Sequence, residues 1–129
     1  MFIRHNILWI LWSICIIGLC LTPGKELPHF EWNQILSLDK ITHVFVYALL
    51  SVLMLTGFNK QFQYQKLREK AIYIVLIYSL VLGVSLELTQ HYFIIDRAFE
   101  WTDIIANIVG TFVGGYTFFL IYRKCLIRN

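Results

Sequence analysis

The side chains with the most suggestive spacing are ionisable and amide groups in three short segments. Asp39, His43 and Tyr47 are each four residues apart, and Asp103 and Asn107 repeat that interval. Residues four apart share one side of a helix. A carboxylate beside an imidazole can act in general acid–base catalysis or take part in binding zinc. Such chemistry requires helices that bring these segments together.

The third segment is Glu87-Leu88-Thr89-Gln90-His91, in which Glu87 shares a helical face with Gln90 and His91. Glu87 falls near the end of a long apolar run. A carboxylate in that position is expected to pair with a cation, a hydroxyl or an amide, or to be protonated. Lys40 and Arg97 are the cations expected nearby.

Structural interpretations remain open beside these functional ones. Asp39 and Asp103 can be N-caps or first-turn residues that interact with the positive end of a helix dipole. Gly110 and Gly114 form a G-x-x-x-G pattern, which is typical of closely packed membrane helices. The polar side chains can also form a hydrogen-bond network whose only role is to fix the helices.

The composition identifies the kind of protein that holds these residues. The chain has 129 residues, of which 58% are hydrophobic and 15% charged. Soluble domains are about 45–50% apolar and about one-quarter charged, and a chain this short buries too little surface to hide so many apolar residues. A disordered tail, a nucleic-acid-binding module and an ordinary cytosolic enzyme are therefore excluded. We expect a small integral membrane protein.

Four continuous apolar stretches predict an all-α, polytopic bundle of four transmembrane helices in a single domain, residues 1–129. The predicted spans are roughly 7–22, 40–58, 71–89 and 103–122. Continuous runs favour helices over a β-barrel, whose strands would alternate. The first stretch lacks a small-x-small cleavage site, so we expect an uncleaved helix and not a signal peptide.

The distribution of charge predicts the orientation of the bundle. Eight of the eleven Lys and Arg residues fall before the first span, between the second and third, or after the fourth. The positive-inside rule then places both termini in the cytoplasm. Seven of the eight acidic residues, all except Glu69, fall at or near the outer face. We therefore expect functional residues on the outer side.

Few partners or cofactors are indicated. Cys15 and Cys20 fall in the first span and Cys125 in the predicted cytoplasmic tail, so no disulfide is expected. We expect no cofactor, no metal and no nucleic-acid partner, and the oligomeric state is left open. A zinc site formed by His43, His91 and the neighbouring carboxylates is the less favoured alternative.

The order and spacing of these motifs resemble the VanZ-like family. The matching pattern is Asp39-Lys40-x-x-His43-x-x-x-Tyr47, Glu87-x-x-Gln90, Arg97, and Asp103-x-x-x-Asn107-x-x-Gly110-x-x-x-Gly114. The resemblance implies a small multi-pass protein of the bacterial plasma membrane, in a family whose namesake is associated with teicoplanin resistance. This chain has Ile95-Asp96 where the family commonly has Pro-Gly, so the loop geometry is expected to differ.

These observations predict a cluster of functional residues at the outer face. The predicted outer cluster comprises Asp39, Lys40, His43, Tyr47, Glu87, Gln90, Arg97, Asp103 and Asn107. The favoured hypothesis is a cell-envelope protein in which this cluster binds a lipid, a cell-wall precursor or a partner and lowers susceptibility to glycopeptides. The alternative is a membrane enzyme that acts on a lipid or cell-wall precursor by His/carboxylate acid–base chemistry.

Overall fold

The computed structural model describes residues 2–21, 32–60, 64–93 and 99–127. Within those ranges the chain is helical and has no strand, which confirms the all-α prediction. The helices are α1 (Phe2–Cys20), α2 (Trp32–Asn59), α3 (Gln65–Glu69), α4 (Ala71–Phe93) and α5 (Trp101–Ile127). The short α3, in the basic connection between the second and third spans, was not predicted.

Four of these helices are long and apolar enough to cross a membrane, as predicted. The candidate spans are Ile3–Cys20, Asp39–Asn59, Ala71–Phe93 and Trp101–Tyr122. Large apolar side chains cover the outside of the bundle, as Ile72, Ile77 and Phe112 illustrate. Because a soluble protein rarely exposes an apolar surface this extensive, the exterior is suited to lipid hydrocarbon.

α2 begins at Trp32, eight residues before the predicted start of its span. Hydropathy marks only the continuous apolar part of a helix. Residues 32–39 are a mixture of polar and apolar types and contain no Pro or Gly that would stop the helix. The interpretation of Asp39 as an N-cap or first-turn residue is therefore wrong. Asp103 does lie in the first turn of α5.

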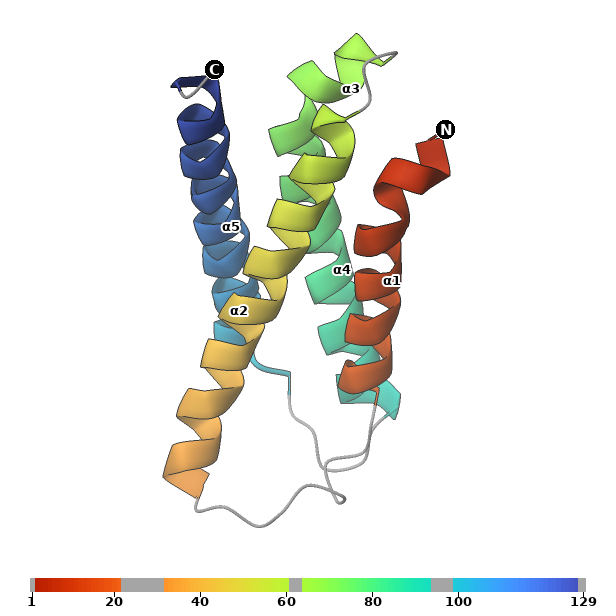
Figure 1. Cartoon of the computed structure of the whole chain (residues 1–129). Helices are drawn as coiled ribbons and strands as arrows, with labels where there is room; N and C mark the ends of the chain where they lie inside the picture. The colour runs from red at the N-terminus through yellow and green to blue at the C-terminus, as the bar shows by residue number, and fades with distance from the viewer. Residues whose placement is uncertain (1, 22–31, 61–63, 94–98, 128–129) are drawn as a thin grey trace.

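The helices form a bundle in which α2 and α4 separate α1 from α5 (Figure 1). The start of α1, the short α3 and the end of α5 lie at one end of the bundle, and α4 ends and α5 begins toward the other (Figure 1). We call the latter the loop end. The start of α1 and the end of α5 therefore lie at the same end of the bundle, as four consecutive spans require. Their location in the cytoplasm remains a prediction.

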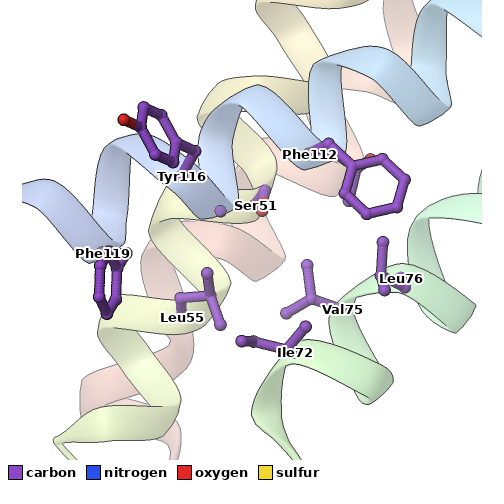
Figure 2. Close-up of a pocket in the computed structure, with 10 residues that line it drawn as sticks. Ser51, Leu55, Ile72, Val75, Leu76, Phe112, Tyr116 and Phe119 are labelled. Carbon is purple, nitrogen blue, oxygen red and sulfur yellow. The ribbon is translucent and has the colours of Figure 1, made fainter.

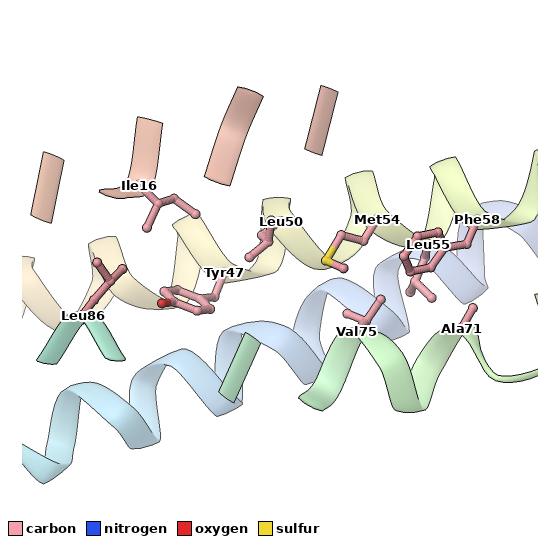
Figure 3. Close-up of a cluster of buried hydrophobic side chains, with 9 residues drawn as sticks. All are labelled: Ile16, Tyr47, Leu50, Met54, Leu55, Phe58, Ala71, Val75 and Leu86. Atoms are coloured by element: carbon pink, nitrogen blue, oxygen red, sulfur yellow. The ribbon is translucent and has the colours of Figure 1, made fainter. Parts of the chain in front are cut away.

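The core is a row of α2 side chains enclosed by α1 and α4 (Figure 3). Tyr47, Leu50 and Met54 follow one another at intervals of three and four residues, and each is at most 1% exposed. Ile16 on α1 and Val75 on α4 pack against this row. The helical period of α2 thus directs one stripe of side chains to the centre of the bundle.

α1 is held by polar contacts as well as by apolar packing. Tyr78 on α4 donates a hydrogen bond to the Ser13 hydroxyl (3.0 Å), and the Trp12 indole donates to the backbone oxygen of Val46 on α2 (3.1 Å). Asn6 is fully buried beside Gly57 of α2, and within α1 its amide oxygen accepts a hydrogen bond from the Trp9 indole (2.9 Å). α1 is therefore an integral part of the bundle.

α2 and α5 form the closest helix pair. A Cβ atom added at Gly110 would lie 2.9 Å from the Val44 Cα atom, and one added at Gly114 would lie 2.8 Å from the Ser51 Cβ atom. The same additions would overlap the backbone oxygens of Val44 and Ala48. These two glycines let the two backbones touch, and this contact fixes how the polar ends of α2 and α5 face each other.

Candidate functional site

Polar side chains from α2 and α5 meet at the loop end of the bundle. Lys40 on α2 donates to a carboxylate oxygen of Glu100 (3.1 Å) and to one of Asp103 (3.2 Å). The Asp103 side chain is 9% exposed and that of Lys40 is 33% exposed. One ammonium group therefore joins two carboxylates at the boundary between the buried interior and the surface.

His43 lies one turn further along α2 and faces Asp103 as well. Its Nδ1 atom is 2.9 Å from the Asn107 amide oxygen. Its Nε2 atom lies 3.8 Å from an oxygen of Asp39 and 3.8 Å from the second oxygen of Asp103. The ring thus lies between an amide on one side and two carboxylates on the other. We call Asp39, Lys40, His43, Glu100, Asp103 and Asn107 the polar cluster.

Asn107 and Tyr47 extend the contacts of the polar cluster toward α4. Both side chains are buried. A Cβ atom added at Gly83 on α4 would lie 2.8 Å from the Asn107 amide nitrogen and 3.3 Å from the Tyr47 hydroxyl. The absence of a side chain at Gly83 therefore leaves room for both groups, and three helices meet at this point.

Glu87 on α4 is attached to the loop that precedes α5. It is 5% exposed, and one of its carboxylate oxygens accepts a hydrogen bond from the backbone N–H of Glu100 (2.8 Å). This bond fixes the position of Glu100, whose side chain contacts Lys40. Glu87 therefore contacts the polar cluster only indirectly: it holds the backbone of Glu100, and the Glu100 side chain contacts Lys40.

Two other predicted residues lie elsewhere. Gln90 donates to the backbone oxygen of Cys20 (2.8 Å), so it joins α4 to the end of α1. His91 is exposed and its ring contacts those of Tyr92 and Phe99. Arg97 lies outside the described residues.

Glu100 is a member of the polar cluster that the sequence reasoning missed. It directly precedes α5 and lies three residues before Asp103, whose backbone N–H donates to its carbonyl oxygen (3.2 Å). Its side chain also accepts a hydrogen bond from the Thr102 hydroxyl (3.3 Å). The sequence signal that could have identified Glu100 is its position three residues before Asp103, because a turn at the start of a helix brings side chains at this spacing to the same side of the helix.

The polar cluster has a surplus of negative charge among the described residues. Asp39, Glu100 and Asp103 carry three carboxylates, and Lys40 supplies one ammonium group. The atoms of Asp39, His43 and Asp103 that can bind a metal all lie within 4.8 Å of one another. The arrangement can therefore bind a cation or a hydrogen-bond donor, or move a proton through His43.

A recess separate from the polar cluster is lined by residues of α2, α4 and α5 (Figure 2). It has a volume of about 280 Å³ and an almost entirely apolar lining, to which Leu55, Val75 and Phe119 contribute. The Thr111 hydroxyl at its margin donates to the backbone oxygen of Asn107 (2.8 Å). This lining suits hydrocarbon, so the polar cluster is the stronger candidate for specific chemistry.

Comparison with known proteins identifies the family of the chain. The family model described as VanZ/LLP1 matches residues 6–123, nearly the whole chain. No curated protein and no solved structure matched the chain. The match includes every residue of the polar cluster and all four candidate spans, apart from the first residues of α1. The chain is therefore a member of the VanZ/LLP1 family of multi-pass membrane proteins.

Proposed function

We propose that this chain is a plasma-membrane protein of the bacterial cell envelope that lowers susceptibility to glycopeptide antibiotics of the teicoplanin type. It does so by binding a lipid-linked or cell-wall ligand at the polar cluster. Membership of the VanZ/LLP1 family supports the assignment to this class of protein. The resistance role comes from the association of the namesake with teicoplanin.

The observation that carries the proposal is the convergence of Lys40, His43 and Asp103 at the loop end of the bundle. Ionisable groups near a membrane interior are costly unless they are paired, and they commonly mark functional sites. Apolar side chains could hold α2 against α5 without that cost. The ionic contacts between α2 and α5 at the loop end therefore support a binding role at that membrane surface.

The basic residues support an outward-facing polar cluster. Lys66, Arg68 and Lys70 lie in or beside α3, at the opposite end of the bundle from the polar cluster (Figure 1). The positive-inside rule assigns such a segment to the cytoplasm. Cell-wall precursors and glycopeptides are then accessible to the polar cluster from outside.

The charges of the polar cluster constrain the ligand. Lys40 already contacts two carboxylates, so an anionic ligand would have to displace one of them or use a further cation. Arg97 is the proposed second cation, since a guanidinium group can hold a phosphate or carboxylate through two hydrogen bonds. We therefore propose a ligand with an anionic group held by Arg97 and donor groups that face Asp39 and Asp103.

The direct test is the susceptibility of a glycopeptide-sensitive strain with and without the protein, against a panel of glycopeptides and lipoglycopeptides. Expression should raise the inhibitory concentration of teicoplanin. Glu87→Gln should remove most of the increase because the neutral amide accepts the Glu100 N–H less strongly. Glu69→Gln, at the opposite end, is the matched control. No change on expression of the wild-type protein would refute the resistance role.

Arg97→Ala tests the proposed anion-binding residue separately. The variant should no longer raise the inhibitory concentration of teicoplanin, while the amount of protein in the membrane, measured by immunoblotting, is unchanged. Lys25→Ala, another outer basic residue by the predicted topology, should keep full activity. A fully active Arg97→Ala variant would show that the anionic group is held elsewhere.

A further inference from the structure

We propose that Asp39, His43 and Asp103 bind one divalent transition-metal cation, Zn²⁺ or Mn²⁺, at the loop end of the bundle. The inference goes beyond the proposed function because it concerns a cation site and requires no antibiotic phenotype. It also departs from the sequence-based expectation of no metal, because the sequence does not show that α2 and α5 bring Asp39, His43 and Asp103 together.

The distances suit a shared ion. Metal–oxygen and metal–nitrogen bonds to zinc are each about 2.1 Å, so two ligand atoms on one ion can be at most about 4.2 Å apart. The Nε2 atom of His43 lies 3.8 Å from an oxygen of Asp39 and 3.8 Å from an oxygen of Asp103. One ion can therefore contact both atoms of each pair. The ligand atoms of Asp39 and Asp103 lie within 4.8 Å of each other, and the 38% exposed Asp39 side chain is free to rotate toward an ion that all three residues share.

The hydrogen bond to Asn107 prepares His43 for this role. An amide oxygen only accepts, so the 2.9 Å contact with Nδ1 requires the proton to be on that nitrogen. Nε2 is then the ring nitrogen that faces the two carboxylates, and it is the nitrogen available to bind a cation between them. Histidine ligands of metals characteristically donate their other N–H to an oxygen in this way.

The charge balance favours a divalent ion. The three carboxylates of Asp39, Glu100 and Asp103 and the single ammonium of Lys40 leave a formal charge of −2 beside the membrane interior. A dication makes this sum zero. Lys40 contacts one oxygen of Asp103, while His43 faces the other, so the lysine does not occupy the proposed position.

The ligand set indicates the kind of metal. One imidazole nitrogen with two carboxylates suits Zn²⁺ or Mn²⁺ better than Ca²⁺ or Mg²⁺, which prefer oxygen ligands alone. Three protein ligands also leave at least one coordination position for water or for an external ligand. The site is thus an open one at the membrane surface.

The first test is metal binding by the full chain in lipid nanodiscs. Samples loaded with Zn²⁺ or Mn²⁺ alone and then dialysed should retain one metal ion per chain, as measured by elemental analysis. The Mn²⁺ sample should show electron spin-echo modulation from one imidazole nitrogen. Substoichiometric metal in both samples, or a Mn²⁺ signal without nitrogen coupling, would overturn the proposal. This measurement needs no variant and so does not depend on a variant's folding.

The second test is the effect of single substitutions on Zn²⁺ affinity. His43→Gln and Asp103→Asn should each weaken binding at least tenfold, whereas His91→Gln and Glu69→Gln should leave it unchanged. Asn107→Ala should weaken binding by about 10–100-fold because it removes the partner that orients His43. Wild-type affinity in the His43→Gln variant would contradict the assignment. This test uses purified protein and no cells. Failure to bind metal would therefore refute the cation site alone, and absence of a resistance phenotype would refute the proposed function alone.

Discussion

The Nδ1 atom of His43 lies 2.9 Å from the amide oxygen of Asn107, which joins α2 to α5 across 64 residues of sequence. The bond fixes the orientation of the imidazole and directs its other nitrogen toward Asp39 and Asp103. The contact between His43 and Asn107 therefore links α2 to α5 and also sets how His43 faces the two carboxylates.

Lys40→Gln should tighten Zn²⁺ binding. The ammonium of Lys40 lies 3.2 Å from Asp103, and its positive charge repels a cation bound to the same carboxylate. Removal of that charge should raise the affinity several-fold in a nanodisc titration. Lys60→Gln, at the opposite end of α2, should have no effect. Weaker binding in Lys40→Gln than in the wild type would mean that Lys40 supports the cation site instead of opposing it.

Gly114→Ala should destabilise the bundle. The new methyl group would lie 2.8 Å from the Ser51 Cβ atom and overlap the Ala48 backbone oxygen, and overpacking of this kind typically costs about 1–3 kcal/mol. Thermal unfolding in detergent should show a lower midpoint.

Gly115→Ala is the matched control for that measurement. Its methyl group would meet the Ser51 hydroxyl oxygen at 3.9 Å and a Leu55 methyl at 4.0 Å, which are ordinary contacts. Both variants replace glycine by alanine in the same turn of α5, so intrinsic helix propensity contributes equally. Equal midpoints for the two variants would contradict the close approach of α2 and α5.

Tyr78→Phe should loosen the attachment of α1 by a small amount. The variant loses the hydrogen bond to the Ser13 hydroxyl, and interhelical bonds of this kind contribute about 0.6 kcal/mol on average in a membrane protein. The free energy of unfolding should fall at least as much in Ser13→Ala as in Tyr78→Phe, because the Ser13 hydroxyl also donates to the Trp9 backbone oxygen (2.9 Å). The double variant should lose little more than Ser13→Ala alone. Tyr73→Phe changes an exposed tyrosine of the same helix and should be neutral. Additive losses in the double variant would rule out the hydrogen bond as their cause.

The parts of the fold that depend on one helix at a time could be predicted from the sequence. Apolar runs gave the four spans, and the four-residue interval put Asp103 and Asn107 on one face of α5. The helical extension before Asp39 could not be found this way, because α2 begins at Trp32, before the continuous apolar run starts.

The pairing between helices could not be predicted, because it depends on the register of α2 against α5. That register is set by the backbone contacts at Gly110 and Gly114. It brings Lys40 to Glu100, which no periodicity connects, while Gln90 is directed to α1 by its position on another face of α4.

The orientation of the bundle predicts a specific labelling pattern. In a variant without the native cysteines, a membrane-impermeant maleimide should label Thr102→Cys on intact cells. It should label Lys66→Cys, in α3, only after the cells are permeabilised. Both side chains are exposed, so access depends on the side of the membrane. The reverse pattern would place the polar cluster in the cytoplasm and exclude direct contact with cell-wall ligands.

The central claim is that the polar cluster lowers glycopeptide susceptibility. Its most direct test is to measure the teicoplanin inhibitory concentration of cells that express His43→Gln or His91→Gln. The two variants change the same residue type near the same end of the bundle, but only His43 contacts Asn107 and faces Asp103. With equal amounts of protein in the membrane, His43→Gln should return the inhibitory concentration to that of cells without the protein, and His91→Gln should retain the wild-type value. Full resistance with His43→Gln would contradict the claim.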